Sequence, residues 1–165
     1  MSAIQINNTA LIDRLEQVVQ RLTDTTPLAA AIALSLDTVT QDNFDSGGRP
    51  TWAGLKAGGA SRLYQSGNLR RSITTAHGRD FAMIGTNVPY AAIHQFGGKT
   101  KPHVIRPKNG KALSFNGLVF KKVNHPGSDI PSREYLPMDQ RGFLQREAED
   151  AIFDDVDYYW QKSFD

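Results

Sequence analysis

The chain has 165 residues, of which 39% are hydrophobic, so it can bury one compact core and leaves little room for a second domain. The absence of cysteine excludes disulfides, thiolate metal sites and cysteine nucleophiles. No apolar run approaches the length of a membrane span, and Met1 to Leu11 lacks the basic-then-apolar order of a signal peptide. We therefore expect a single domain over residues 1–165 that is made in the cytoplasm and does not enter a membrane.

Charge is unevenly distributed along the chain, although the formal net charge is only +2. Residues 81–128 carry seven basic and no acidic side chains, whereas residues 129–165 carry ten acidic and four basic ones. The seven basic residues are Lys99, Lys101, Arg106, Lys108, Lys111, Lys121 and Lys122. This segregation predicts two surfaces of opposite charge on one subunit.

The N-terminal third predicts two helices. Thr9 can cap a helix that runs to about Leu22, because its apolar residues recur at a spacing of 3.6. A second helix begins at Thr26, with proline at the first helical position, and continues toward Phe44. Together, over about residues 9–45, the two should form a helical hairpin.

The central part predicts strands and one short helix, over about residues 68–125. A glycine-rich loop containing Trp52 should be tied down by burial of that ring. Residues 69–77 and 81–86 then read as two strands of a hairpin, since both are rich in β-favouring residues around a Gly-Arg-Asp turn. A short helix should follow and stop at Gly97-Gly98.

The remainder predicts an extended hairpin and a final helix. Apolar runs on either side of Lys108-Asn109-Gly110 indicate a hairpin, because Asn-Gly favours a tight turn, and a further strand should cover residues 118–123. The last helix should run from about Asp139 to Trp160. The expected fold class is α+β, with the helical hairpin and the C-terminal helix packed on an antiparallel β-sheet that carries the extended β-hairpin.

Motifs for catalysis or cofactor binding are missing. Residues 97–100 (GGKT) look like the end of a phosphate-binding loop, but Ile93 stands where the first glycine is required and Pro102 interrupts the helix that should follow. The four histidines lack metal-ligand spacing, and no serine lies in a nucleophile elbow. A hydrolase would need His94 or His125 to meet a serine and an acid in the fold. We expect no enzyme activity, no metal and no cofactor.

Acidic side chains gather near the end of the last helix, where the helix dipole disfavours them. They are Asp150, Asp154, Asp155 and Asp157. One interpretation is that these carboxylates form a solvated face of the helix. The other is that a binding partner stabilises their negative charge.

The basic middle segment leaves a second function open. Phe115 and Phe120 lie among Lys111, Lys121 and Lys122, as in modules that stack bases on aromatic rings while binding phosphates. The pattern favours an amphipathic hairpin whose phenylalanines enter the core, because Leu113, Phe115 and Val119 also fit burial. A basic nucleic-acid-binding module is therefore the alternative function.

Five blocks of sequence, in order, resemble the phage virion morphogenesis or tail-completion family of the Mu-like G protein type. The blocks are residues 48–55 (GRPTWAGL), Leu63 with 66–73 (SGNLRRSI), 84–87 (IGTN), 90–98 (YAAIHQFGG) and 130–136 (IPSREYL). The resemblance implies a structural protein, without catalysis or cofactor, that completes or terminates the tail, joins it to the head, or both, as a ring subunit. The hairpin over residues 101–125 is similar to one in related tail-completion and neck proteins.

The resemblance also implies a location and partners. The protein should be assembled in the bacterial cytoplasm and end in the tail or neck of the virion, in a ring that tail symmetry makes six-membered. Its neighbours would be other copies of itself, the tail tube, and head-completion or connector proteins. Our hypothesis for the Lys-rich region 99–122 is that it meets either the acidic C-terminal helix of a neighbouring copy or the DNA that passes through the ring.

Overall fold

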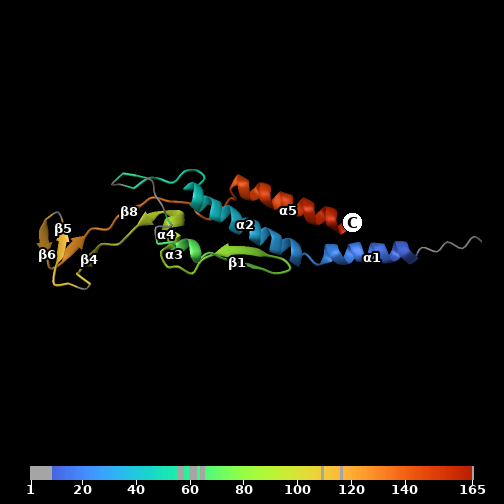
Figure 1. The fold of residues 1–165 in the computed structure, drawn as a ribbon, viewed down its shortest axis with the longest axis horizontal. Coiled ribbons are helices and arrows are strands. Elements are labelled where there is room, and N and C mark those ends of the chain that lie inside the picture. Colours follow the sequence, from blue (N-terminus) through green and yellow to red (C-terminus); the bar gives the residue numbers. More distant parts are fainter. Residues whose placement is uncertain are drawn as a thin grey trace, which may run out of the picture.

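The computed structural model describes residues 9–55, 58–59, 63, 66–108, 110–115 and 117–164. The molecule is elongated, with a helical end, a central body and a ribbon of paired strands at the opposite end (Figure 1). The mixture of helices and antiparallel strands confirms the α+β class. Within these residues, four separate two-stranded ladders replace the predicted single antiparallel sheet.

The first two helices are α1 (Thr9–Thr23) and α2 (Thr26–Ser46), close to their predicted bounds. The predicted helical hairpin is wrong, because α1 continues roughly in line with α2 and lies against the end of another helix, α5 (Arg146–Phe164) (Figure 1). The hydroxyl of Tyr159 in α5 donates to the carbonyl oxygens of Arg21 and Asp24, and two arginines of α1 donate in the opposite direction. Arg14 donates to the carbonyl oxygen of Phe164 at 3.2 Å, and Arg21 donates to that of Lys162 at 3.0 Å.

The central body is organised around α2. The hairpin of β1 (Thr74–His77) and β2 (Ala82–Gly85) packs against α2 in the predicted pairing, with Thr74 opposite Gly85. α5 packs on α2 as well. The predicted strand over 69–77 is shorter than expected, because its first residues form the helical turn α3 (Asn68–Arg71), which places Leu69 in the core.

The short helix α4 (Ala91–Phe96) ends at Gly97, as predicted. Gly97 has a φ of 71°, and a Cβ at this position would lie 2.9 Å from the backbone nitrogen of Ser132, so both the turn and the close approach require glycine. The chain then enters β3 (Gly98–Lys99), which pairs with β8 (Asp129–Ile130). Residues 97–100 are therefore a helix stop and a strand, consistent with the rejection of a phosphate loop.

Residues 98–130 form an extended ribbon, called the arm below. After the β3·β8 ladder, β4 (His103–Ile105) pairs with β7 (Val123–His125), and β5 (Leu113–Phe115) pairs with β6 (Leu118–Phe120) near the tip. The predicted extended hairpin is thus present, but the expected pairing across Asn109-Gly110 is wrong and residues 118–123 are split between two strands. The tight turn lies after Phe115, where Gly117 has a φ of 75°.

The last helix begins at Arg146 rather than near Asp139. The side chain of Asp139 accepts hydrogen bonds from the backbone N–H groups of Arg141 and Phe143, at 2.8 and 3.0 Å, and so stabilises a turn. These backbone hydrogen bonds, with that of Phe143 as the main cause, lower the pKa of Asp139. The residue predicted to open a helix therefore closes a loop before it.

The hydrophobic core is small and has two parts. The first contains Phe44, Trp52, Leu69, Ala91 and Tyr135, and thus joins α2, the glycine-rich loop, α3, α4 and the segment before α5. The second is formed by Leu36, Val39 and Ala148 between α2 and α5. Trp52 is 7% exposed, which confirms the predicted burial of its ring.

Buried polar side chains fasten these segments together. Asn43 of α2 donates to the carbonyl oxygen of Tyr135 at 3.2 Å and to Gln145 at 2.8 Å. Gln95 of α4 accepts from the backbone N–H groups of Tyr135 and Leu136, both at 3.0 Å, and donates to the carbonyl oxygen of Met138 at 2.9 Å. Two of the blocks that carry the family resemblance, residues 90–98 and 130–136, are thus joined by buried hydrogen bonds.

Tyr135 gives this core a pH dependence. Burial raises the pKa of Tyr135 to about 12, above its usual value of 10.0. An acid whose pKa is raised by folding contributes stability below the unfolded pKa and loses it as the pH rises toward the folded one. We expect the free energy of unfolding to fall between pH 10 and 12, and to fall less in Tyr135→Phe. Urea denaturation at several alkaline pH values measures the difference, and equal slopes in both proteins would contradict the assignment.

Candidate interaction surfaces

A large share of the apolar side chains of this subunit is exposed. On α1, apolar residues line one face, and none of them is buried. Others lie on α5, on the β1–β2 hairpin and on the arm. Side chains at least half exposed are Leu11, Leu15, Val19, Leu34, Leu55, Phe81, Met83, Leu118, Val119, Phe143, Phe153, Tyr158, Trp160 and Phe164. Such extensive exposure is typical of a chain whose surfaces are covered by other molecules.

The predicted basic residues all lie on the arm, either in its ladders or in the connections between them. Lys99 lies 3.9 Å from Asp129 across the β3·β8 ladder. Within the described residues, the other six form no ion pair with an acidic side chain: Lys101, Arg106, Lys108, Lys111, Lys121 and Lys122. With seven basic residues and one acidic residue, residues 98–130 have a net charge of +6.

The predicted acidic residues lie on α5 but do not all face solvent. Asp154 and Asp157 are exposed, and Asp150 lies 3.8 Å from Arg146 one turn earlier. Asp155 is half-buried and accepts a hydrogen bond from Ser35 of α2 at 2.7 Å, so it helps to hold the two helices together. The acidic surface of α5 is therefore made by three of the four predicted aspartates, extended by Glu149.

The basic and acidic surfaces do not meet within one subunit. The arm occupies one end of the long axis, and α5 lies in the body and ends toward the other side (Figure 1). A partner for either surface must therefore come from outside the subunit.

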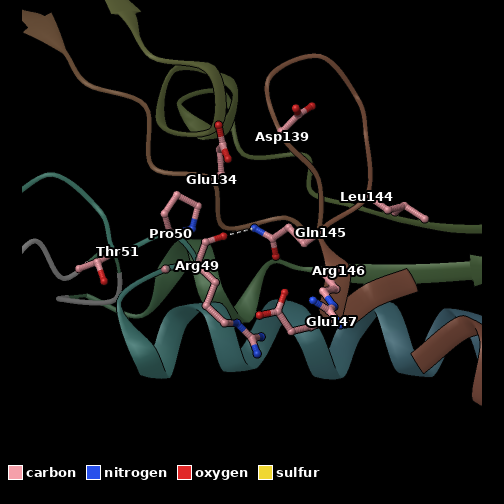
Figure 2. A pocket seen from close by; sticks show the side chains of 10 residues that line it. Arg49, Pro50, Thr51, Glu134, Asp139, Leu144, Gln145, Arg146 and Glu147 are labelled. Carbon is pink, nitrogen blue, oxygen red and sulfur yellow. Dashed lines mark hydrogen bonds between the residues drawn. The ribbon is translucent and has the colours of Figure 1, made fainter. Parts of the chain in front are cut away.

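An open depression lies where the loop after α2 meets the start of α5. Figure 2 shows Arg49, Glu134, Asp139 and Glu147 around it, with the Gln145 amide donating to the backbone oxygen of Arg49 at 2.8 Å. Arg49 is already engaged, since it donates to Asn43 at 3.0 Å and to the carbonyl oxygen of Val39 at 3.1 Å. Arg49, Asp139 and Gln145 thus all have hydrogen-bond partners within the fold.

The histidines do not form the constellation that hydrolysis would require. His94 is half-buried, and its Nδ1 atom has no hydrogen-bond partner among the described residues. Burial, followed by the nearby Arg133 cation, lowers the pKa of His94, so the ring is neutral at pH 7. His125 accepts at Nδ1 from the N–H of Gly127 and stacks on His103, with the ring centres 5.1 Å apart.

In the described part of the chain, no group of three or more His, Cys, Asp or Glu side chains is arranged to hold a metal ion. None of the described helices has both the length and the apolar composition needed to cross a bilayer.

Sequence reasoning missed one feature of the surface and one of the core. The apolar face of α1 was expected to pack in a helical hairpin, but it lies exposed. The 3.6-residue spacing of apolar residues predicts a helix with an apolar face and does not say what that face contacts. The buried role of Asn43 was also missed, because its partners Tyr135 and Gln145 lie 92 and 102 residues away in the sequence.

Comparison with known proteins gives a consistent assignment. The model of the phage virion morphogenesis family matches residues 6–160. The Mu-like prophage FluMu G protein 2 of Haemophilus influenzae is 43% identical over 100 residues, which cover 60% of this chain and 72% of that protein. Protein G of Escherichia phage Mu, which is named for capsid assembly, is 37% identical over 92 residues, or 56% of this chain and 44% of that protein. No solved structure matches significantly. Since the family model spans nearly the whole sequence, this chain belongs to the phage virion morphogenesis family.

Proposed function

We propose that this protein is a non-catalytic ring subunit that completes or terminates the phage tail, joins it to the head, or both. The observation that carries the proposal is the separation of unlike surfaces on one elongated subunit: a basic arm at one end, and α5 with its acidic surface in the body. A closed ring needs two different complementary patches on every copy, because each subunit contacts its neighbours head to tail.

Two further observations support a structural role. The exposed apolar surface of α1, α5 and the arm would be covered in an assembly, where its burial contributes about 25 cal/mol for each Å² removed from water. The described residues also lack a metal cluster, and the histidines make no contact with a serine or carboxylate side chain among the hydrogen bonds and ion pairs of that region. The proposed partners are other copies of this chain, the tail tube, and head-completion or connector proteins.

We also propose a place in the virion, the neck. The name of the phage Mu relative refers to capsid assembly, which favours a position in the neck, where tail and head meet, over one along the tail shaft. Six copies would match the symmetry of a tail tube.

A second candidate is a nucleic-acid-binding module. It is favoured by the six arm cations that form no ion pair within the described residues. In that case the isolated subunit would bind DNA, and log K would fall linearly with log salt concentration, with a slope set by the number of phosphates contacted.

The experiment that tests the ring is light scattering of the purified protein over a range of protein and salt concentrations, with and without tail tubes. We expect the mass of a closed ring, either in solution or once tubes are added. A monomer that ignores tubes and binds DNA with a steep salt dependence would contradict the ring and support the nucleic-acid module.

A further inference from the structure

The tip of the arm combines apolar and basic side chains. In β6, Leu118 and Val119 are 61% and 71% exposed, although both are aliphatic. Lys121 and Lys122 follow directly and are exposed as well. Among the described strands β6 pairs only with β5, so one of its edges has no described strand beside it. Because successive side chains of a strand point to opposite faces, Val119 and Leu118 lie on opposite sides of the ribbon. The tip therefore offers an exposed apolar side chain on each face, followed by two positive charges.

The outer face of α5 combines apolar and acidic side chains in a matching way. Phe153 is 67% exposed, and Trp160, two turns later, is 55% exposed. Glu149 and Asp157, four residues before and after Phe153, lie on the same side of the helix, and Asp154 adjoins it. This face is an apolar stripe bordered by negative charges.

We propose that the arm of one subunit docks on α5 of the next copy in the ring, an inference that rests on the ring subunit function proposed above. Val119 would cover Phe153, and Lys121 and Lys122 would lie near the aspartates beside it. Docking within one subunit is excluded by the positions of the arm and α5 along the molecule (Figure 1). A head-to-tail contact between copies satisfies both surfaces at once.

Burial of apolar surface, together with charge, favours a second copy over DNA as the occupant of the arm. α5 carries six acidic and two basic residues, a net charge of −4, against +6 for the arm. Phosphates would satisfy the lysines, but they would leave Val119 exposed to water, whereas docking on α5 removes the apolar surfaces of Val119 and Phe153 from water. The neighbouring α5 therefore accounts for more of the arm tip than DNA does.

Cysteine cross-linking tests the contact directly, because the chain has no cysteine of its own. Val119→Cys and Asp154→Cys are combined in one full-length chain, assembled on tail tubes and oxidised. We expect a ladder of covalent oligomers on a non-reducing gel, ending at the number of subunits in the ring and collapsing to monomer on reduction. The matched control pairs Val119→Cys with Thr75→Cys, an exposed position on β1, and should give no ladder.

A charge exchange separates the contact from general effects on folding. Lys121→Glu with Lys122→Glu should weaken ring formation by about tenfold or more at low salt, and by less as salt screens the charges. Adding Asp154→Lys and Asp157→Lys to the same chain should restore it. Circular dichroism spectra of all variants should match that of the unaltered protein, since the four side chains are exposed.

Each result separates the docking contact from the ring itself. Rings that form normally in the reversed variant, without a cysteine ladder, would overturn the docking contact and leave the ring function intact. Failure of the unaltered protein to form rings on tubes would overturn the ring function. Loss of DNA binding in the reversed variant, with ring formation unchanged, would overturn the docking contact and assign the arm to DNA.

Discussion

Replacing Trp52 with alanine is expected to lower the free energy of unfolding by about 3–5 kcal/mol, the usual range for removing a buried aromatic ring. The indole is 7% exposed and packs edge-on against Phe44, with ring centres 6.0 Å apart. Its N–H donates to the carbonyl oxygen of Glu134 at 3.0 Å. The substitution would therefore open a cavity and release the loop after α2 from the segment before α5.

Urea denaturation followed by circular dichroism measures this loss. The matched control is Trp160→Ala, which removes the same side chain from a position that is 55% exposed, and should change the free energy of unfolding by less than about 1 kcal/mol. Trp52→Phe should fall between the two, because it retains a ring and loses one hydrogen bond. Equal effects of the two alanine substitutions would contradict the core described here.

Replacing Gln95 with leucine is expected to cost about 3 kcal/mol or more, although leucine is apolar and similar in size. Gln95 is 1% exposed, and its amide satisfies two backbone N–H groups and one carbonyl oxygen of residues 135–138. Each backbone group left buried without a partner costs about 1–3 kcal/mol. The loss should therefore exceed that of an ordinary polar-to-apolar change.

Two variants define the cause of this effect. Gln95→Glu retains the acceptor for both N–H groups but loses the donor to Met138, so it should be destabilised less than Gln95→Leu at neutral pH. Gln140→Leu removes an exposed glutamine with a hydrogen bond to Ser132 and should have little effect. Thermal unfolding ranks the three, and a Gln95→Leu protein as stable as Gln140→Leu would refute the role of the buried amide.

Local sequence signals predicted the helices and the first hairpin well. The apolar period predicts α1 and α2, and Pro27 marks the start of α2, because both signals depend on neighbouring residues. The predicted threonine cap is wrong, since Thr26 lies within α2 and the residue before it makes no side-chain capping hydrogen bond. The same signals misplaced the start of α5, since Asp139 can begin a helix or close a turn and its hydrogen bonds to Phe143 decide for the turn. Leu69 was assigned to a strand because its burial in a helical turn depends on residues far away in the sequence.

The arm shows the limit of dipeptide signals. Two Asn-Gly pairs lie within it, at 109–110 and 116–117, and either could form a tight turn. The pairing of Phe115 with Leu118 places the turn at the second pair, which the sequence prediction did not consider. Residues 109 and 116 lie outside the described part of the chain.

For the candidate surfaces, the sequence located the charges but not their surroundings. The opposite charges of the two segments follow from counting, and the arm and α5 do carry them. The contact between Asp155 and Ser35, 120 residues away, depends on helix packing that no local pattern encodes. The exposed apolar face of α1 likewise depends on where the linker after α1 directs the chain.

The way α1 is attached has a thermodynamic consequence. It contributes no buried side chain, and hydrogen bonds such as those from Arg14 and Arg21 to the end of α5 lie on the surface and contribute roughly 0.5–1.5 kcal/mol each. Detaching α1 therefore costs far less than opening the core around Tyr135. The helix and the body behave as two cooperative units of unequal stability, so α1 can change its position while the rest of the subunit keeps its shape.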